Sequence, residues 1–240
     1  MAELKLPARL RQSDTFRTAL KKGGMRGTTA WLIKQVYPVE IFDFFVTGMN
    51  DLRGGTAAPD GRMLRLRSAA DCRGCAEAML DQLGRHGGHG VRSIVASGGR
   101  VYALVEDGEI MAQLTMDLAG PVAIENPIPL KIALPEKTGF LSHLYTYPAW
   151  RRHGLAHRLI RSAVQDLSRE GVSQVIAHVS STNIASQNAF LQTGWRRTGL
   201  VVTDRSSRVL YSGQRLAAHG ITLAARMARE NRFQQPFRLS

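Results

Sequence analysis

Apolar positions between residues 62 and 213 recur with two different periods, which predicts strands and helices in alternation. The helical period is clearest over residues 153–169, where apolar side chains fall on one stripe and Gly171 follows as a stop signal. Asp107-Gly108 joins two strand patterns and is typical of a hairpin turn. Helices are also predicted at 68–83 and 184–192, and strands at 63–66, 100–105, 110–115, 139–146, 172–179, 195–201 and 207–211.

The order of these segments predicts an α/β or α+β fold. The strand, helix and strand between residues 140 and 179 should form a right-handed crossover with parallel strands, whereas the hairpin makes another part of the sheet antiparallel. Ser68 and Asp71 have the spacing of a capping box at the start of the first helix.

The main domain is predicted to span residues 62–213. Residues 1–61 before it are predicted to form a basic N-terminal extension. It contains a helix pattern at 29–36 and an aromatic-rich strand pattern at 39–46, and ends in a Gly- and Pro-containing linker. An exposed aromatic strand would create an apolar patch. We therefore expect it to pack on the main domain or on a second copy of the chain, as a homodimer. Residues 214–240 are predicted to be a basic tail with a helix over 214–231.

The composition limits the class of protein. With 240 residues, 44% of them hydrophobic, the chain can bury a core. Lys and Arg number 32 against 19 Asp and Glu, and the net charge of +13 favours polyanionic partners. Two cysteines, no bilayer-length apolar stretch and no signal-peptide pattern indicate a cytoplasmic protein. The basic N-terminal segment could bind the membrane periphery, but its few aromatic residues disfavour nucleic acid.

Residues 151–156, Arg-Arg-His-Gly-Leu-Ala, open the helix predicted at 153–169 after a strand that ends at Tyr147-Pro148. A helix start presents free backbone N–H groups and the positive end of the helix dipole, which together bind anions. Gly154 lets the backbone approach a phosphate closely, and the two arginines add positive charge. For this segment alone, an ordinary turn with solvated arginines is the alternative interpretation.

Two further motifs follow the helix and the next strand. Asn183 and Ser186 form an Asn-x-x-Ser pattern, and Gly194-Trp195 begins eleven residues after Asn183. The combination Arg-x-x-Gly-x-Ala, helix, strand, Asn-x-x-Ser and Gly-aromatic resembles the GNAT superfamily of N-acetyltransferases, most strongly over residues 140–195. The resemblance implies a central mixed, mostly antiparallel twisted sheet with a splayed parallel strand pair and helices on both faces. It also implies acetyl-CoA or another acyl-CoA as cosubstrate.

The resemblance also assigns roles to matching residues. It implies that backbone amides at the start of the helix hold the pyrophosphate of coenzyme A, and that the end of the preceding strand holds the pantetheine arm. Phe190 stands where the family often has a tyrosine that protonates the leaving thiolate, so the proton must come from elsewhere or be unnecessary. The cofactor-binding residues implied in this way are Leu144, Thr146, Arg151, Arg152, His153, Gly154, Leu155, Ala156, Asn183, Ser186 and Phe190.

An attacking amine must be neutral, and a base or a water relay usually removes its proton. His143 is the leading candidate, because it lies three residues before Thr146 on the strand that faces the acyl group in the family and histidine titrates near pH 6.5. Tyr145 has the same strand parity and is the second catalytic candidate. A hydrogen-bonded core histidine without a chemical role is the alternative for His143. Weaker candidates are Tyr147, His178 and Glu106.

The sequence thus predicts an N-acyltransferase that moves an acetyl or other acyl group from acyl-CoA to an amine of a small molecule or protein, by direct attack in a ternary complex. A long-chain N-acyltransferase that uses an acidic acyl carrier protein is one alternative, which the net charge suits. A catalytically silent GNAT-like acyl-CoA-binding or scaffold protein is the other, which Phe190 allows. A site closed by Phe190 and Tyr145 would favour an acetyl group. A wide apolar gap between the two parallel strands would favour a longer acyl chain.

Two remaining patterns give structural expectations. Cys72 and Cys75 form a CxxC without the second pair that a zinc site needs, and the histidines show no metal spacing, so no metal is predicted. Both cysteines are expected within one helix. The proline-rich stretch 120–137 is expected to be an ordered cover loop that forms part of the acceptor wall.

Overall fold

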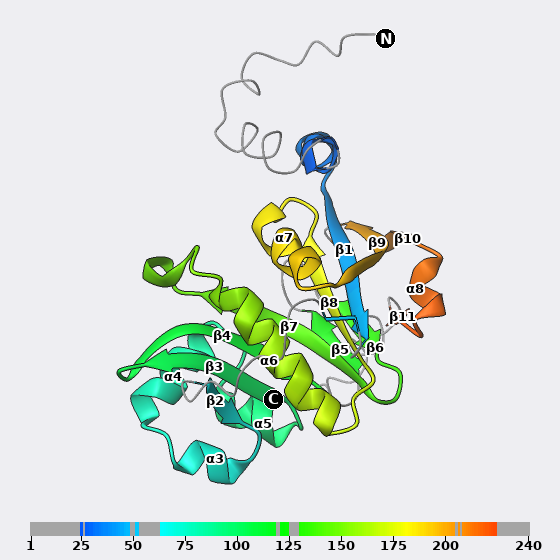
Figure 1. Cartoon of the computed structure of the whole chain (residues 1–240). Coiled ribbons are helices and arrows are strands. Elements are labelled where there is room, and N and C mark those ends of the chain that lie inside the picture. Colours follow the sequence, from blue (N-terminus) through cyan, green and yellow to red (C-terminus); the bar gives the residue numbers. More distant parts are fainter. Residues whose placement is uncertain are drawn as a thin grey trace, which may run out of the picture.

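The computed structural model describes residues 25, 27–48, 51–52, 63–118, 121–124, 130–204, 206 and 208–224. The larger of its two sheets is built from β1 (Val39–Gly48), β2 (Met63–Leu66), β3 (Arg100–Glu106), β4 (Glu109–Asp117), β7 (Thr138–Thr146), β8 (Gln174–Ser180), β9 (Arg196–Asp204) and β10 (Val209–Ser212). The smaller is built from β5 (Pro121–Ile124), β6 (Leu130–Ala133) and β11 (Thr222–Ala224). The spatial orders are β10-β9-β1-β8-β7-β4-β3-β2 and β11-β6-β5 (Figure 1).

Helices cover both faces of the larger sheet. The described helices are α3 (Ala69–Arg73), α4 (Glu77–Arg85), α5 (Val91–Ala96), α6 (Leu155–Arg169), α7 (Ile184–Gln192), α8 (Arg215–Ala218), the 3-10 turn η1 (Pro148–Trp150) and a helix over residues 27–36. Side chains of β3 alternate between the faces, so Tyr102 packs in the core with α6 and Val101 packs under α3 to α5. No described helix combines the length and the apolar character that crossing a membrane requires.

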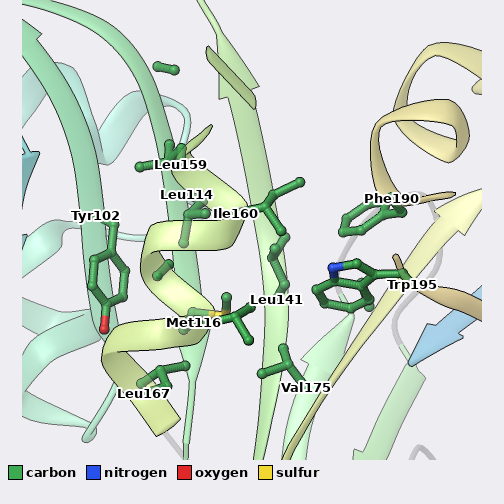
Figure 2. Close-up of a cluster of buried hydrophobic side chains, with 14 of the residues drawn as sticks. Tyr102, Leu114, Met116, Leu141, Leu159, Ile160, Leu167, Val175, Phe190 and Trp195 are labelled. Atoms are coloured by element: carbon green, nitrogen blue, oxygen red, sulfur yellow. The ribbon is translucent and has the colours of Figure 1, made fainter. Parts of the chain in front are cut away.

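The main core lies between α6 and the larger sheet (Figure 2). Leu159, Ile160 and Leu167 of α6 are fully buried against residues of β4, β7 and β8, as their shared stripe predicts. At the edge of this core, the hydroxyl of Tyr102 donates a hydrogen bond to the Asp166 carboxylate (3.2 Å). Burial is the main reason why the pKa of Tyr102 is raised, so the phenol remains a neutral donor.

The aromatic strand near the N-terminus is a central strand of the larger sheet. β1 lies between β8 and β9 and is antiparallel to both. Its successive phenylalanines face opposite sides: Phe45 joins the core under α6, and Phe44 joins a second core under the smaller sheet and α8. The larger sheet therefore contains strands from both sides of the predicted boundary at residue 61.

The strands β7 and β8 form the predicted parallel pair, but only over part of their length. Pairing runs from Thr138 with Gln174 to Leu141 with Ala177, although β7 continues to Thr146. On its other side, β7 has a bulge against β4, where Ser142 is the extra residue between two paired positions. A bulge bends a strand. The two parallel strands therefore separate after Leu141, and the mixed, mostly antiparallel architecture is as the sequence predicts.

The predicted helix at 68–83 is in fact two helices. The capping box of Ser68 and Asp71 is present at the start of α3, as predicted. The helix ends after Arg73, where Gly74 is the C-cap, and α4 begins only at Glu77. Glycine disfavours a helix interior, which explains the break. Cys75 consequently lies between the helices, so the expectation of both cysteines within one helix is wrong.

Two predictions near the smaller sheet are also wrong for the described residues. The tail helix ends at Ala218, because Gly220 takes a left-handed conformation (φ 69°), and β11 follows. Within the stretch 120–137, residues 121–124 and 130–133 are not a loop but the paired strands β5 and β6, with Val122 and Ile132 buried. Pro121 is compatible with a strand because β5 lies at the edge of its sheet, where proline is tolerated. Residues 225–231 lie outside the described part of the chain.

Candidate functional site

The start of α6 is an exposed turn that no described side chain caps. Gly154 is the N-cap and has a left-handed backbone (φ 71°), and residues 151–154 are exposed. The N–H of Arg158 donates to the carbonyl of Gly154 (3.2 Å), so the N–H groups of residues 155–157 precede the hydrogen-bond ladder of the helix. A Cβ at Gly154 would meet no atom within 4 Å. These amides and the positive helix end are thus open to an anion.

Arg151 ties this turn to the end of β7. Its Nε donates to the carbonyl of Thr146 (3.1 Å), and its guanidinium carbon lies 5.9 Å from the ring centre of Tyr145. Arg152 has a φ of 70°, which is uncommon for a non-glycine residue. Two exposed positive charges therefore flank the anion-accessible amides.

One edge of β7 lacks a strand partner in the described structure beyond Leu141. Leu144 pairs with Leu114 and Thr146 with Ala112, both on β4, whereas the pairing with β8 has already ended. An unpaired strand edge presents backbone N–H and C=O groups at regular spacing. The predicted pantetheine-binding residues thus lie on a strand with a free edge that runs toward the α6 turn.

Asn183 has a structural role in addition to its predicted contact with the cofactor. It is the N-cap of α7, and its side-chain oxygen accepts a hydrogen bond from the N–H of Ser186 (3.2 Å). Gln187, one residue further, donates to the carbonyl of Ser180 (3.1 Å) and fixes the same turn to the end of β8. Asn183 is exposed, and its contact with the cofactor stays a prediction.

Phe190 is a core residue, with 2% of its surface exposed. Its ring stacks on Phe45 (5.6 Å between centroids) and meets Trp195 edge-on (4.8 Å). Figure 2 shows Phe190 and Trp195 side by side at one edge of this core. This position therefore contributes packing and has no hydroxyl group to protonate a leaving group.

His143 and Tyr145 both face the turn that follows α4, as their shared strand parity predicts. The ring of His143 lies directly over Gly88, where a Cβ would come within 2.4 Å of its Cε1. The ring of Tyr145 stacks on that of His86 at 3.8 Å between centroids. His143 is half-buried, so it is neither an inaccessible core residue nor a free surface side chain.

The three weaker candidates lie in less suitable surroundings. Tyr147 donates from its hydroxyl to Gln113 (3.3 Å), and burial is the main cause of its raised pKa, which makes it a poor base. His178 packs on the ring of Phe140 (5.6 Å between centroids) under the smaller sheet. Glu106 lies at the closed end of the β3–β4 hairpin, about 20 Å along β4 from the level of His143.

A cavity of about 200 Å³ opens beside His143, and no sequence pattern pointed to it. It lies between the α4–α5 turn and α5 on one side and the start of β5 on the other, with β4 and β7 below. Pro121 and Val122, at the start of β5, line the cavity. The stretch 120–137 is expected to form part of the acceptor wall, and these are its described residues that line the cavity. The polar lining groups are His89, Ser97, Thr115, Asp117, Ser142 and His143.

Asp117 lines this cavity and is a candidate site residue that no sequence motif indicated. Burial is the largest influence on its carboxyl group and raises its pKa, although a hydrogen bond with Ser142 and the positive charges of His143 and His89 act in the opposite direction. It is the one carboxyl group among the described lining residues, and no Lys or Arg is among them.

Asparagine in place of Asp117 should increasingly stabilise the fold as the pH rises above about 4, until the carboxyl group of the wild type is ionised in the folded protein. The folded protein holds the carboxyl proton to higher pH than the unfolded chain, so ionisation of Asp117 lowers the stability of the wild type over this range. Denaturant unfolding at several pH values would measure the difference between variant and wild type. Glu109→Gln, an exposed acid on the same strand, should follow the wild type. A constant difference for Asp117→Asn would contradict the raised pKa.

A second cavity, of about 500 Å³, lies between β9, β10 and α8 with Arg197 and Arg215 in its wall. None of the predicted catalytic or cofactor-binding residues lines this cavity. Within the described ranges, no three or more His, Cys, Asp or Glu side chains are grouped so as to hold a metal ion.

Comparison with known proteins identifies a family. The model of the Acetyltransferase (GNAT) family matches residues 72–195, just over half of the chain. No curated protein matches the sequence. The match begins within α3 and ends before β9. Strand β1 lies outside the matched residues, although it is a central strand of the larger sheet.

Solved structures with related architecture come from several bacteria. A protein of Novosphingobium aromaticivorans described as a GNAT-family acetyltransferase is 17% identical, with a TM-score of 0.47 over 68% of this chain and 62% of that one. A GNAT-family acetyltransferase from Colwellia psychrerythraea is 12% identical, with a TM-score of 0.49 over 82% and 74%. A GCN5-related N-acetyltransferase from Sphaerobacter thermophilus is 14% identical, with a TM-score of 0.43 over 72% and 54%. The chain thus spans less than two thirds of the first and third proteins.

Proposed function

The chain belongs to the GNAT family of acetyltransferases, and from that premise we propose that it transfers an acetyl group from acetyl-CoA to the nitrogen of an amine acceptor. The amine attacks directly while both substrates are bound, so the protein acts mainly by positioning them. The observation that carries the proposal is the uncapped, exposed start of α6 beside the free edge of β7.

The residues present suit coenzyme A. The amides of residues 155–157 and the open space at Gly154 fit a pyrophosphate, and Arg151 and Arg152 add complementary charge. The free edge of β7 around Leu144 fits the amide groups of a pantetheine arm, because an extended ligand can pair with a strand edge as another strand would. The gap beyond Leu141 is then where the thioester would enter.

The chemistry requires one proton to leave the amine and one thiolate to depart. The nitrogen forms a bond to the carbonyl carbon of the thioester, the carbon–sulfur bond breaks, and the amine proton passes to His143 directly or through water. The thiolate can take a proton from solvent, since a thiol pKa lies only about one to two units above neutral pH. Phe190 in place of a tyrosine is compatible with this sequence of events.

A short acyl group is supported by the packing around Phe190. Its ring packs against Phe45 and Trp195 in the core under α6, so side chains occupy the space that a long acyl chain would need there. The net charge of +13 favours, as a second candidate, a donor carried by an acidic acyl carrier protein. Transfer from acetyl-CoA without carrier protein would exclude a strict need for that partner.

Alanine at Gly154 should weaken acetyl-CoA binding about tenfold. The added methyl group projects into the space that the pyrophosphate would occupy, and the left-handed backbone becomes strained by about 1–2 kcal/mol. Calorimetric titration with acetyl-CoA measures the affinity, and mass spectrometry of acceptor amines measures transfer.

The matched control for this change is Gly171→Ala at the other end of α6. Gly171 is also left-handed (φ 86°) and its Cβ position is also open, so both variants bear the same backbone strain. Only Gly154→Ala should lose affinity. Equal losses of affinity in both variants would show that the start of α6 does not bind acetyl-CoA. A wild type that binds acetyl-CoA but acylates no amine would indicate a binding protein.

A further inference from the structure

The cavity beside His143 has a polar floor made by β4 and β7. Thr115 and Asp117 lie two residues apart on the same face of β4, which places their side chains about 7 Å apart. His143 pairs with Thr115 across the strands, and Ser142 donates to the Thr115 carbonyl (3.4 Å). His143 and the hydroxyl of Thr115 therefore lie opposite each other on the two strands, and the carboxyl group of Asp117 lies about 7 Å further along β4.

The hydroxyl of Thr115 is a buried polar group that the protein leaves unsatisfied. Thr115 is 2% exposed, and its Oγ1 has no hydrogen-bond partner among the described residues. A buried hydroxyl without a partner lowers stability, and such groups are rare unless a ligand or water completes them. Because Thr115 lines the cavity, a polar ligand bound there would supply the missing hydrogen bond.

Asp117 gives the cavity a local negative charge within a strongly basic chain. No Lys or Arg among the described lining residues neutralises it, and its burial disfavours the ionised form. A bound cation would relieve that penalty, because an opposite charge at close range stabilises a carboxylate. The cavity is also smaller than the roughly 300–1,000 Å³ of sites for drug-sized molecules, which suits a compact ligand.

We infer that this cavity binds the acceptor and selects a compact amine that carries a second cationic group, with Asp117 as the anchor and the reacting nitrogen beside His143. The acceptor role rests on the proposed acyl transfer, whereas the cation preference concerns the cavity alone. A four-carbon diamine suits the spacing, because one nitrogen reaches the carboxylate while the other lies near Thr115 and the imidazole.

Calorimetric titration with three four-carbon probes tests this inference directly. The probes are 1,4-diaminobutane, butylamine, which lacks the second amine, and 4-aminobutyrate, which replaces it with a carboxylate. The wild type should bind the diamine about tenfold more tightly than butylamine and bind 4-aminobutyrate most weakly. Asp117→Asn should abolish the diamine preference. Glu109→Gln, with the same charge change at the exposed end of β4, should retain it.

The same solutions supplied with acetyl-CoA separate this inference from the proposed function. Equal binding of the three probes by the wild type, or an undiminished diamine preference in Asp117→Asn, would overturn the inference even if amines are acetylated. Preferential diamine binding that depends on Asp117, without any acetylated product, would uphold the cation site and count against acyl transfer. Circular dichroism of both variants verifies that they are folded.

Discussion

Alanine in place of His143 is expected to lower kcat/KM about a hundredfold at neutral pH and to replace the acid limb set by the imidazole with one set by the amine. A general base contributes about 10²–10⁴ in rate, and we expect the lower end because water can replace it in part. Activity of the wild type should fall at acid pH, because only the neutral imidazole can accept the proton. In the variant the rate should instead follow the neutral fraction of the amine. Steady-state kinetics from pH 5.5 to 9.5 measure both profiles.

Two comparisons distinguish a base from a packing residue at this position. Imidazole added to His143→Ala can occupy the space left over Gly88 and should restore part of the rate, whereas a purely structural defect would not respond. His178→Ala removes a histidine from the neighbouring strand β8 and should keep the acid limb. An unchanged pH profile in His143→Ala would end the base assignment.

The parts of the site that sequence predicts are those encoded by short segments. The start of α6 is readable because its anion-binding potential follows from a helix start, a glycine and two arginines within six residues. The parallel pairing of β7 with β8 is readable because the chain order of strand, helix and strand permits little else. His143 and Tyr145 share a face because side chains on a strand alternate.

The parts that sequence does not predict depend on contacts between distant segments. Asp117 is simply the last residue of a strand, and its burial arises only when α5 and β5 close over it. The position of β1 between β8 and β9 follows from tertiary pairing that no local pattern encodes. The bulge at Ser142, which turns β7 away from β8, likewise has no signal in the residues of β7 itself.

The central position of β1 connects the N-terminal region to the proposed donor site. Asp43 on β1 is 1% exposed and accepts a hydrogen bond from the hydroxyl of Ser181 (2.6 Å). The same carboxylate forms an ion pair with Arg197 of β9 (3.3 Å). Ser181 lies in the turn between β8 and α7, two residues before Asn183. One buried carboxylate thus joins two strands, β1 and β9, and holds the turn that carries a predicted cofactor contact.

Alanine in place of Asp43 is therefore expected to lower the free energy of unfolding by about 3–5 kcal/mol. Removal of one partner of a buried ion pair leaves the other charge without compensation, and here Ser181 also loses its acceptor. Denaturant unfolding at neutral pH measures the change. Glu40→Ala is the matched control on the same strand, because Glu40 pairs with Lys34 (2.6 Å) nearer the surface and should cost about 1 kcal/mol or less.

The double variant Asp43→Leu/Arg197→Leu separates the ion pair from the strand itself. If most of the loss in Asp43→Ala comes from the stranded charge of Arg197, removing both charges should recover much of the stability, since apolar replacements of buried pairs are often neutral. If Asp43→Ala costs no more than Glu40→Ala, the carboxylate does not hold β1 in the sheet. A large loss that the double variant does not recover would assign the stabilisation to the hydrogen bond from Ser181. The affinity for acetyl-CoA should then also fall, because that bond fixes the turn before Asn183.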